Sequence, residues 1–157
     1  MNKQSQAPSA DDPFGLHRFI LAQEGEYFRA LAELKRGRKE SHWIWFIFPQ
    51  IEGLGHSPTS RYFAIRSLEE ARQYLAHPVL GPRLNGCCEA VLALPTQLIS
   101  NIFGPPDDLK FRSSMTLFAQ AAGHESVFGK LLNKFFGGHL DERTLEILRQ
   151  LAKGNPI

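Results

Sequence analysis

The sequence has little of what membrane proteins, secreted proteins and nucleic-acid-binding proteins usually need. Its longest run of apolar residues extends only from Trp43 to Phe48, whereas a membrane helix needs about twenty. Its two cysteines, Cys87 and Cys88, are adjacent, and a disulfide between neighbours would be strained. The formal net charge of +2 is small for a protein that neutralises a nucleic-acid backbone. We therefore predict a cytoplasmic protein with reduced cysteines, no membrane segment and no dedicated nucleic-acid partner.

Several signatures of catalysis are also missing. The chain has no glycine-rich phosphate loop ending in Lys-Ser or Lys-Thr, no His-Glu-x-x-His, no Cys-x-x-Cys and no Gly-x-Ser-x-Gly elbow. Its histidines never recur three or four positions apart, so no helix offers two imidazoles on one face. These absences disfavour the familiar hydrolase, metalloprotease and kinase plans, and we predict neither a metal site nor a bound cofactor.

Length and composition fit one globular domain. The chain has 157 residues, of which 43% are hydrophobic and 22% are charged, enough to bury a core without a metal or a disulfide. Residues 1–11 contain no aromatic residue and are rich in Ser, Gln and Ala, so they lack the apolar surface that offsets the entropy cost of ordering. We predict a disordered tail over residues 1–11 and a single all-helical domain over residues 12–153.

Signals for helix starts recur along this domain. Ser67 with Glu70 forms a capping box, and Ser57 followed by Pro58 is typical of an N-cap with proline at the first helical position. Three aspartates are further predicted N-caps: Asp12, Asp107 and Asp141. Gly25 interrupts the first helical pattern and can divide it into two helices.

The stretch from His42 to Pro49 is apolar at almost every position, so periodicity cannot distinguish a strand from a helix there. No second strand of similar character is available to pair with it, and an isolated strand would leave its backbone groups unpaired. We therefore predict a short buried helix that is capped by Ser41 and stopped by Pro49. The fold class predicted for the whole chain is all-α, a single-layered multi-helix bundle of seven to nine short helices with no significant sheet.

The segment from Lys39 to Gln50 combines aromatic, imidazole, amide and ammonium groups. In a helix that starts at Ser41, His42 and Trp45 share one face, which places a titratable ring beside an aromatic surface able to stack on a base. Polar groups that border so apolar a run need specific partners. The alternative is that the apolar residues Trp43 to Phe48 are core and that His42 only satisfies one end of the helix.

A second polar cluster lies in the segment from Asp107 to Phe118. Lys110 sits in the first turn of the predicted helix, where a cation opposes the helix dipole and an anion would be favoured. One interpretation is that Lys110, with the hydroxyls of Ser114 and Thr116, binds a phosphate or carboxylate. The other is that Asp107 and Asp108 neutralise Lys110 while the hydroxyls bond back to helix carbonyls.

The order of these motifs resembles a known family. The relevant stretches are Gly37-Arg-Lys39-x-Ser-His42-Trp-x-Trp45-Phe-x-Phe-Pro49-Gln50, Gly53-Leu-Gly55-x-Ser57, Glu70-Ala71-x-x-Tyr74-Leu75-x-His77-Pro78, and Lys110-x-x-Ser113-Ser114-Met115-Thr116-Leu117-Phe118. Over about residues 12–150 the chain is similar to domain-of-unknown-function family 1810. This resemblance implies a small all-helical protein of a mostly bacterial family, and it implies no established activity. The name calpastatin that some members carry does not fit, because a calpain inhibitor would be disordered and repetitive.

The leading functional hypothesis is a pocket for a small anionic ligand, such as a nucleotide or a derivative of ADP-ribose or NAD. Its predicted ligand-binding residues are Lys39, His42, Trp45, Gln50, Lys110, Ser114 and Thr116. If the protein is an enzyme, His42 is the candidate general acid or base. The alternative is a non-enzymatic adaptor that docks a protein partner on an exposed aromatic surface. A minor further possibility is contact between the basic cluster Lys35 to Lys39 and RNA.

Overall fold

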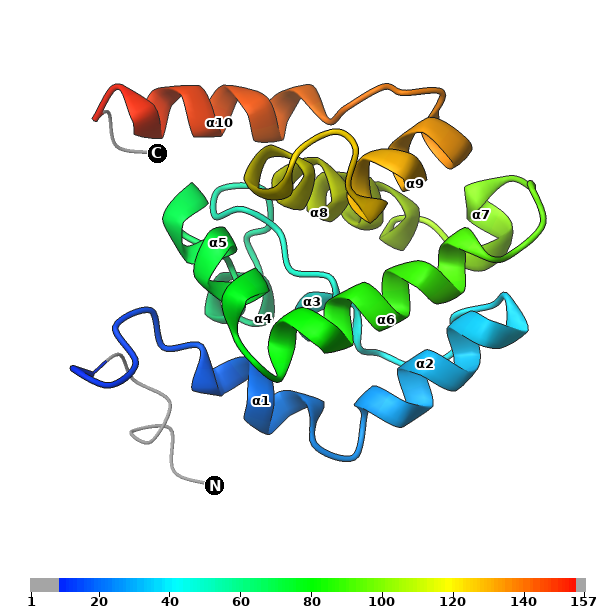
Figure 1. Ribbon diagram of the computed structural model, residues 1–157, viewed down its shortest axis with the longest axis horizontal. Helices are drawn as coiled ribbons and strands as arrows, with labels where there is room; N and C mark the ends of the chain where they lie inside the picture. The colour runs from blue at the N-terminus through cyan, green and yellow to red at the C-terminus, as the bar shows by residue number, and fades with distance from the viewer. Residues whose placement is uncertain (1–8, 155–157) are drawn as a thin grey trace.

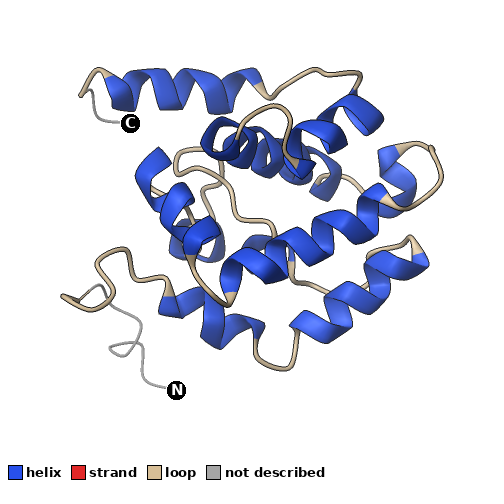
Figure 2. Cartoon of the chain, in the orientation of Figure 1, coloured by secondary structure: helices blue, strands red, loops and turns tan. Residues whose placement is uncertain are grey.

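The computed structural model describes residues 9–154, so most of the predicted tail, residues 1–8, lies outside the described part. The described residues form ten helices and no strand, which confirms the all-α prediction (Figure 2). The helices are α1 (His17–Gln23), α2 (Tyr27–Arg36), α3 (Ile44–Ile47), α4 (Pro58–Tyr62), α5 (Leu68–Ala76), α6 (Leu80–Leu92), α7 (Ile99–Ile102), α8 (Asp107–Ala122), α9 (Val127–Phe136) and α10 (Glu142–Ala152). None of these helices has both the length and the apolar character that crossing a bilayer requires.

The number of helices exceeds the predicted seven to nine because the chain divides at Gly25. Gly25 has φ of +77°, a left-handed conformation that glycine adopts without the penalty paid by residues with a Cβ atom. The backbone therefore turns sharply between α1 and α2 instead of continuing as one long helix.

Three of the predicted helix caps are confirmed. The Ser57 hydroxyl accepts the Ser60 amide at 3.1 Å at the start of α4. The Ser67 hydroxyl accepts the Glu70 amide at 3.0 Å at the start of α5. Asp141 caps α10 by accepting the amide of Thr144 at 3.0 Å. Each of these bonds spans three residues, and a local pattern in the sequence is enough to specify it.

The other three caps differ from the prediction. The Asp12 carboxylate accepts the amides of Leu16 and His17, so α1 begins at His17, later than the Asp12–Pro13 pair suggested. Ser41 does not cap α3, which begins at Ile44, because its hydroxyl donates to Glu33 at 2.6 Å. Asp107 is the first residue of α8 rather than its cap, and its carboxylate pairs with two lysines instead of the helix amides.

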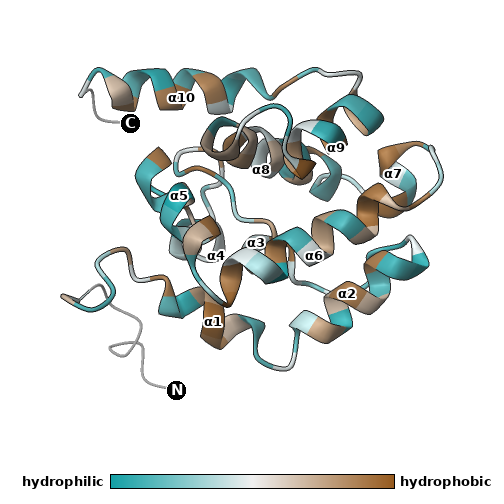
Figure 3. Ribbon diagram, in the orientation of Figure 1, coloured by the Kyte–Doolittle hydropathy of each residue, from teal (hydrophilic) through white to brown (hydrophobic). Residues whose placement is uncertain are grey.

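The core is built around α8, whose residues 113–119 are all buried. In Figure 1, α6 and α8 lie between α2 at one end of the molecule and α10 at the other, and α5, α9 and α10 all contact α8. Both hydrophobic and hydrophilic residues recur along α2 and α10 (Figure 3), as expected for amphipathic helices that place one face on the core.

Aromatic rings join the segment around α3 to α8. The rings of Phe48 and Phe111 lie 4.9 Å apart, and those of Phe103 and Phe111 lie 4.5 Å apart. Trp43 contacts Phe48 and Phe103 from the other side. This confirms the interpretation that the apolar residues of this segment are mainly core, and it fixes α3 relative to α8.

The two cysteines lie within α6, and both are buried and free. Burial raises the pKa of the Cys87 thiol to about 12 and raises that of Cys88 as well. A buried thiol that stays protonated is a poor nucleophile. The prediction of inert, unbridged cysteines therefore agrees with the structure, and neither thiol enters the candidate site.

Candidate functional site

A cavity of about 440 Å³ opens beside α4, within the range of sites that bind small molecules. We call it the α4 cavity. Its charged and polar lining residues are Gln50, Glu52, His56, Ser60, Arg61 and Arg66. Trp45 and Phe63 add aromatic surface, and Leu151 from α10 completes one side. The cavity therefore combines basic, acidic, hydrogen-bonding and aromatic groups.

Two backbone segments form the frame of this cavity. The Ile65 amide donates to the Gln50 carbonyl at 2.8 Å, and the Glu52 amide donates to the Ile65 carbonyl at 2.8 Å, so Ile51 and Ile65 form an isolated parallel bridge. Successive side chains of extended backbone point to opposite sides. The side chains of Gln50 and Glu52 consequently share a side, and so do those of Ala64 and Arg66.

The loop before α4 also packs tightly on that helix. A Cβ atom added to Gly55 would come within 2.5 Å of the Ser60 side chain, a distance that real Cβ atoms do not reach. Only glycine allows this approach. The loop and the helix therefore meet as a single rigid wall of the cavity.

Three charged side chains at the cavity are not engaged elsewhere. The side chains of Arg61, Arg66 and Glu52 make no hydrogen bond or ion pair with any residue in the described range 9–154. Arg61 and Arg66 are exposed. A guanidinium group with free donors binds carboxylates and phosphates through paired hydrogen bonds. Two such groups against one carboxylate give the cavity an excess of positive charge.

The indole of Trp45 has an unsatisfied donor. Its indole Nε1 is buried and has no hydrogen-bond partner in the structure, although the residue lines the cavity. The neighbouring Trp43 differs, because its Nε1 donates to Glu33 at 2.9 Å. A buried donor without a partner costs about 1–3 kcal/mol. Because Nε1 itself is closed to solvent, Trp45 lines the cavity with its aromatic ring rather than with this donor.

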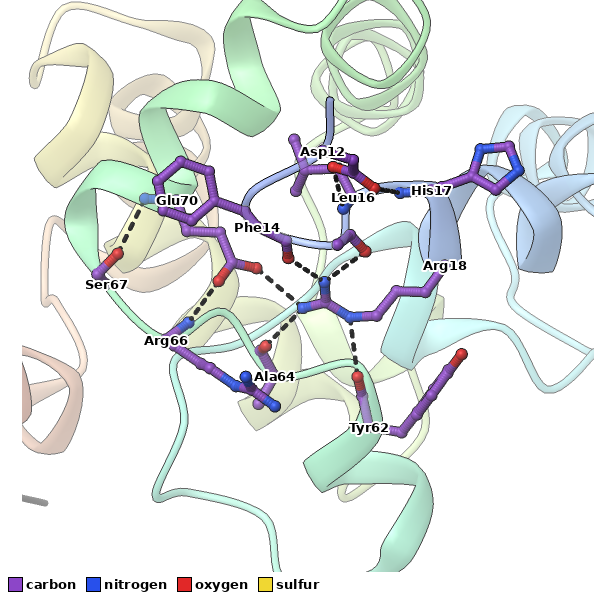
Figure 4. Close-up of polar contacts among 11 residues, drawn as sticks. Asp12, Phe14, Leu16, His17, Arg18, Tyr62, Ala64, Arg66, Ser67 and Glu70 are labelled. Atoms are coloured by element: carbon purple, nitrogen blue, oxygen red, sulfur yellow. Dashed lines mark hydrogen bonds and ion pairs between the residues drawn. The ribbon is translucent and has the colours of Figure 1, made fainter. Parts of the chain in front are cut away.

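Arg18 of α1 is bonded to the segment that follows Arg61, at Tyr62 and Ala64, and reaches Arg66 through Glu70 (Figure 4). Arg18 is 8% exposed, and its guanidinium donates five hydrogen bonds. Four of them go to the carbonyls of Phe14, Gly15, Tyr62 and Ala64, and the fifth goes to Glu70 at 2.9 Å. All five donors of the group are thereby used. Glu70 also accepts the Arg66 amide at 3.2 Å, so this buried ion pair holds both ends of residues 62–66.

Glu33 has the same role for the segment around α3. Its buried carboxylate accepts the amides of Glu40 and Ser41, the Ser41 hydroxyl and the Trp43 indole. Burial alone would raise the pKa of the Glu33 carboxyl, but these hydrogen bonds outweigh burial and lower the pKa from 4.5 to about 2. A carboxylate held in this way stays ionised and keeps the segment in place.

The structure places the seven predicted ligand-binding residues in different surroundings. Trp45 and Gln50 line the α4 cavity. His42 is exposed and lines a separate concavity with Glu40 and Ser41, which shares no lining residue with the α4 cavity. His42 is therefore not brought to the cavity, because α3 begins at Ile44 and His42 lies outside the helical turn that was to align it with Trp45.

Lys39 and Lys110 are brought together, but by a carboxylate. Asp107 lies 2.8 Å from the Lys39 ammonium and 3.7 Å from the Lys110 ammonium. Each ammonium also lies over a tryptophan ring, Lys39 at 5.1 Å from the centre of Trp43 and Lys110 at 5.2 Å from that of Trp45. This arrangement matches the alternative in which Asp107 neutralises Lys110, and it fixes both tryptophans relative to α8.

Ser114 and Thr116 are fully buried in α8, and neither lines the α4 cavity. The Thr116 hydroxyl donates to the Arg112 carbonyl and accepts the Asp141 amide, both at 2.9 Å. The Ser114 hydroxyl has no hydrogen-bond partner among residues 9–154. Both face the packed interior because the buried surface of α8 is wider than the single apolar stripe that the sequence suggested.

Replacing Ser114 and Thr116 one at a time compares the stability contribution of a hydrogen-bonded hydroxyl with that of an unpaired one. Thr116→Ala is expected to lower the free energy of unfolding by about 1–2 kcal/mol, because the Asp141 amide loses its acceptor. Ser114→Ala is expected to change it by less than about 1 kcal/mol, since no hydrogen bond is lost. Urea unfolding followed by circular dichroism measures both. A larger loss for Ser114→Ala than for Thr116→Ala would contradict these assignments.

Comparison with known proteins identifies the family. A sequence model of the family described as protein of unknown function (DUF1810) matches residues 13–148. The chain belongs to this family. Among solved structures, it is similar to the crystal structure of a conserved hypothetical protein from Mycobacterium tuberculosis, with 51% sequence identity and a TM-score of 0.86 over 88% of this chain and 99% of the other. No curated protein matches the chain.

The residues that matter most in this DUF1810 protein were not all visible in its sequence motifs. Arg18 belongs to no motif. A buried cation requires a buried carboxylate, but the sequence does not indicate that Glu70 is that partner. The sequence predicts Glu70 as part of a capping box, and its carboxylate does accept a nearby backbone amide, that of Arg66. Arg61 lies in α4, Arg66 lies between α4 and α5, and neither belongs to a motif, so only the folded chain brings them to the same cavity as Trp45.

Proposed function

We propose that this DUF1810 protein binds a small anionic molecule in the α4 cavity. Arg61 and Arg66 hold the anionic group, while the Trp45 ring and the Gln50 amide contact the rest of the ligand. The observation that carries the proposal is the meeting, in one cavity, of the unengaged guanidinium groups of Arg61 and Arg66 with the aromatic surface of Trp45 and the amide of Gln50. Because no carboxylate of the described chain engages these guanidinium groups, their donors remain free for an anion.

The proposed ligand is still a small anion, as the sequence suggested, but the residues that bind its charge are Arg61 and Arg66 instead of Lys39 and Lys110. Lys39 and Lys110 already have Asp107 as their counter-ion, whereas Arg61 and Arg66 have none within the described chain. Arginine also suits the task better, since its planar fork matches the oxygens of a phosphate or a carboxylate.

The adaptor alternative has less support. Among the residues in the described range, the large hydrophobic side chains that are mostly exposed are Phe28, Leu98 and Leu109. Phe28 is the one aromatic residue of the three, and they belong to separate segments, α2, the loop before α7 and α8. An adaptor that docks through an aromatic surface would require a contiguous patch.

A thermal-shift screen tests the proposal. The panel contains phosphate, pyrophosphate, small carboxylates, nucleotides and NAD derivatives, and a ligand at 100 times its Kd is expected to stabilise the protein by about 2.7 kcal/mol. In the double variant Arg61→Ala with Arg66→Ala, this stabilisation is expected to disappear. The matched control is Arg72→Ala with Arg143→Ala, which removes the same charge from two exposed surface pairs.

The control separates site binding from general electrostatics. If both double variants lose the ligand response equally, the ligand is responding to net charge rather than to the α4 cavity. If no anion of the panel stabilises the wild-type protein, the proposed function is wrong.

A further inference from the structure

Resting on the proposed function, we infer that the anionic ligand of the α4 cavity is a ribonucleoside monophosphate. The cavity places three different recognition chemistries around one space. Arg61 and Arg66 suit a phosphate, Glu52 suits the hydroxyls of a sugar, and Trp45 with Phe63 suits a planar ring. A nucleoside monophosphate presents these three groups in a single molecule.

Among the lining residues, Glu52 restricts the chemical class of the ligand most. In a site for a bare anion, a carboxylate would repel the ligand. The Glu52 carboxylate is also not used to neutralise the cations, because it makes no ion pair with Arg61 or Arg66. Its position is fixed, because its own amide donates to Ile65 in the bridge. An ionised carboxylate only accepts hydrogen bonds, and paired sugar hydroxyls are donors that fit it.

The aromatic side of the cavity suits a base. Trp45 is partly exposed, and its ring is held by Lys110 at 5.2 Å. Phe63 is held by contacts with Phe19 and Phe46, at ring separations of 5.7 Å and 5.5 Å. Rings fixed in this way offer stacking surface at little cost in entropy. The Gln50 amide provides both a donor and an acceptor for the edge of a base.

The size of the cavity limits the ligand. A volume of about 440 Å³ lies toward the lower end of the range of about 300–1,000 Å³ that small-molecule sites cover. We expect one nucleoside with one phosphate to occupy this space and a dinucleotide to reach beyond the residues that line it. The size therefore favours a mononucleotide over NAD.

Isothermal titration calorimetry with matched ligands tests this inference. The ligands are the four ribonucleoside 5′-monophosphates, inorganic phosphate, ribose 5-phosphate, adenosine, NAD and 2′,3′-dideoxyadenosine 5′-monophosphate. At least one ribonucleotide is expected to bind about tenfold or more tightly than phosphate, and adenosine monophosphate about tenfold more tightly than its dideoxy analogue, because the analogue cannot donate hydroxyls to Glu52.

The variant Glu52→Gln is the matched change in the protein. It is expected to weaken ribonucleotide binding about tenfold while leaving the affinity for the dideoxy analogue the same or higher. If Glu52→Gln strengthens the binding of ribonucleotides and phosphate alike, Glu52 only repels anions and its assignment to sugar hydroxyls is wrong.

The outcomes distinguish this inference from the function on which it rests. If phosphate or ribose 5-phosphate binds as tightly as every nucleotide, and the binding requires Arg61 and Arg66, the anion site stands and the nucleotide inference is overturned. If NAD binds more tightly than every mononucleotide, the conclusion that the cavity favours a mononucleotide over a dinucleotide is wrong. If no phosphate compound binds, the nucleotide inference is wrong, and binding of a carboxylate in the thermal screen then decides whether the proposed function survives.

Discussion

Replacing Arg18 by methionine is expected to lower the free energy of unfolding by about 3–5 kcal/mol, the cost of breaking a buried ion pair by removing one partner. The substitution keeps most of the side-chain volume but leaves the Glu70 carboxylate, which is 1% exposed, without its counter-ion. It also removes the donors that satisfy the carbonyls of Tyr62 and Ala64. Urea unfolding at neutral pH measures the change.

A double variant shows whether the cost comes from the stranded carboxylate. Arg18→Met with Glu70→Gln is expected to be more stable than Arg18→Met alone, because no unpaired charge remains buried. A control at an exposed pair, Arg143→Met, is expected to change stability by less than about 1 kcal/mol. If Arg18→Met costs no more than this control, Arg18 does not hold the wall of the α4 cavity in the way described.

Replacing Glu33 by glutamine is expected to lower the free energy of unfolding by about 2–4 kcal/mol near neutral pH. Four donors converge on the Glu33 carboxylate, and a glutamine amide would place its own N–H groups against some of them. The control Glu125→Gln alters an exposed carboxylate and is expected to have little effect. Urea unfolding of both variants measures the difference.

The same residue predicts how stability depends on pH. The pKa of Glu33 is about 2 in the folded chain and 4.5 in its ordinary state, so the unfolded chain binds the proton more readily. Its contribution of roughly 3 kcal/mol is fully present above about pH 4.5 and is lost as the pH falls toward 2. Between pH 6 and pH 3, wild-type stability is therefore expected to fall more steeply than that of Glu33→Gln. Parallel curves for the two proteins would contradict the assignment.

How far the sequence predicts this molecule depends on the distance over which each interaction acts. The caps at Ser57, Ser67 and Asp141 each join residues three positions apart, so the local pattern was sufficient. The pairing of Arg18 with Glu70 spans 52 positions, and no local pattern indicates which carboxylate a buried arginine will meet. The helical content was accordingly predicted well, and the ion pair that organises the cavity was not predicted.

The candidate site shows the same limit. Trp45 and Gln50 were predicted because aromatic and polar groups next to an apolar run need particular partners, and both line the cavity. For Lys110 the sequence left open both an anion-binding cation and one neutralised by Asp107 and Asp108, and Asp107 does pair with it. That Lys39 shares the same Asp107 could not be predicted, because the two residues are far apart in the sequence. Conversely, no sequence pattern singled out Arg61 and Arg66, because their shared cavity exists only once the bridge between Ile51 and Ile65 has formed.

The two tryptophans allow the central claim, an anion site at Trp45, to be tested in one experiment. In a ¹H–¹⁵N spectrum each indole N–H gives its own signal, and Trp45→Phe assigns them. On titration with a nucleoside monophosphate, the Trp45 indole signal is expected to move because the ligand lies against its ring, while that of Trp43, which is buried and donates to Glu33, stays in place. A Trp45 signal that does not move with any anion that binds would contradict the account.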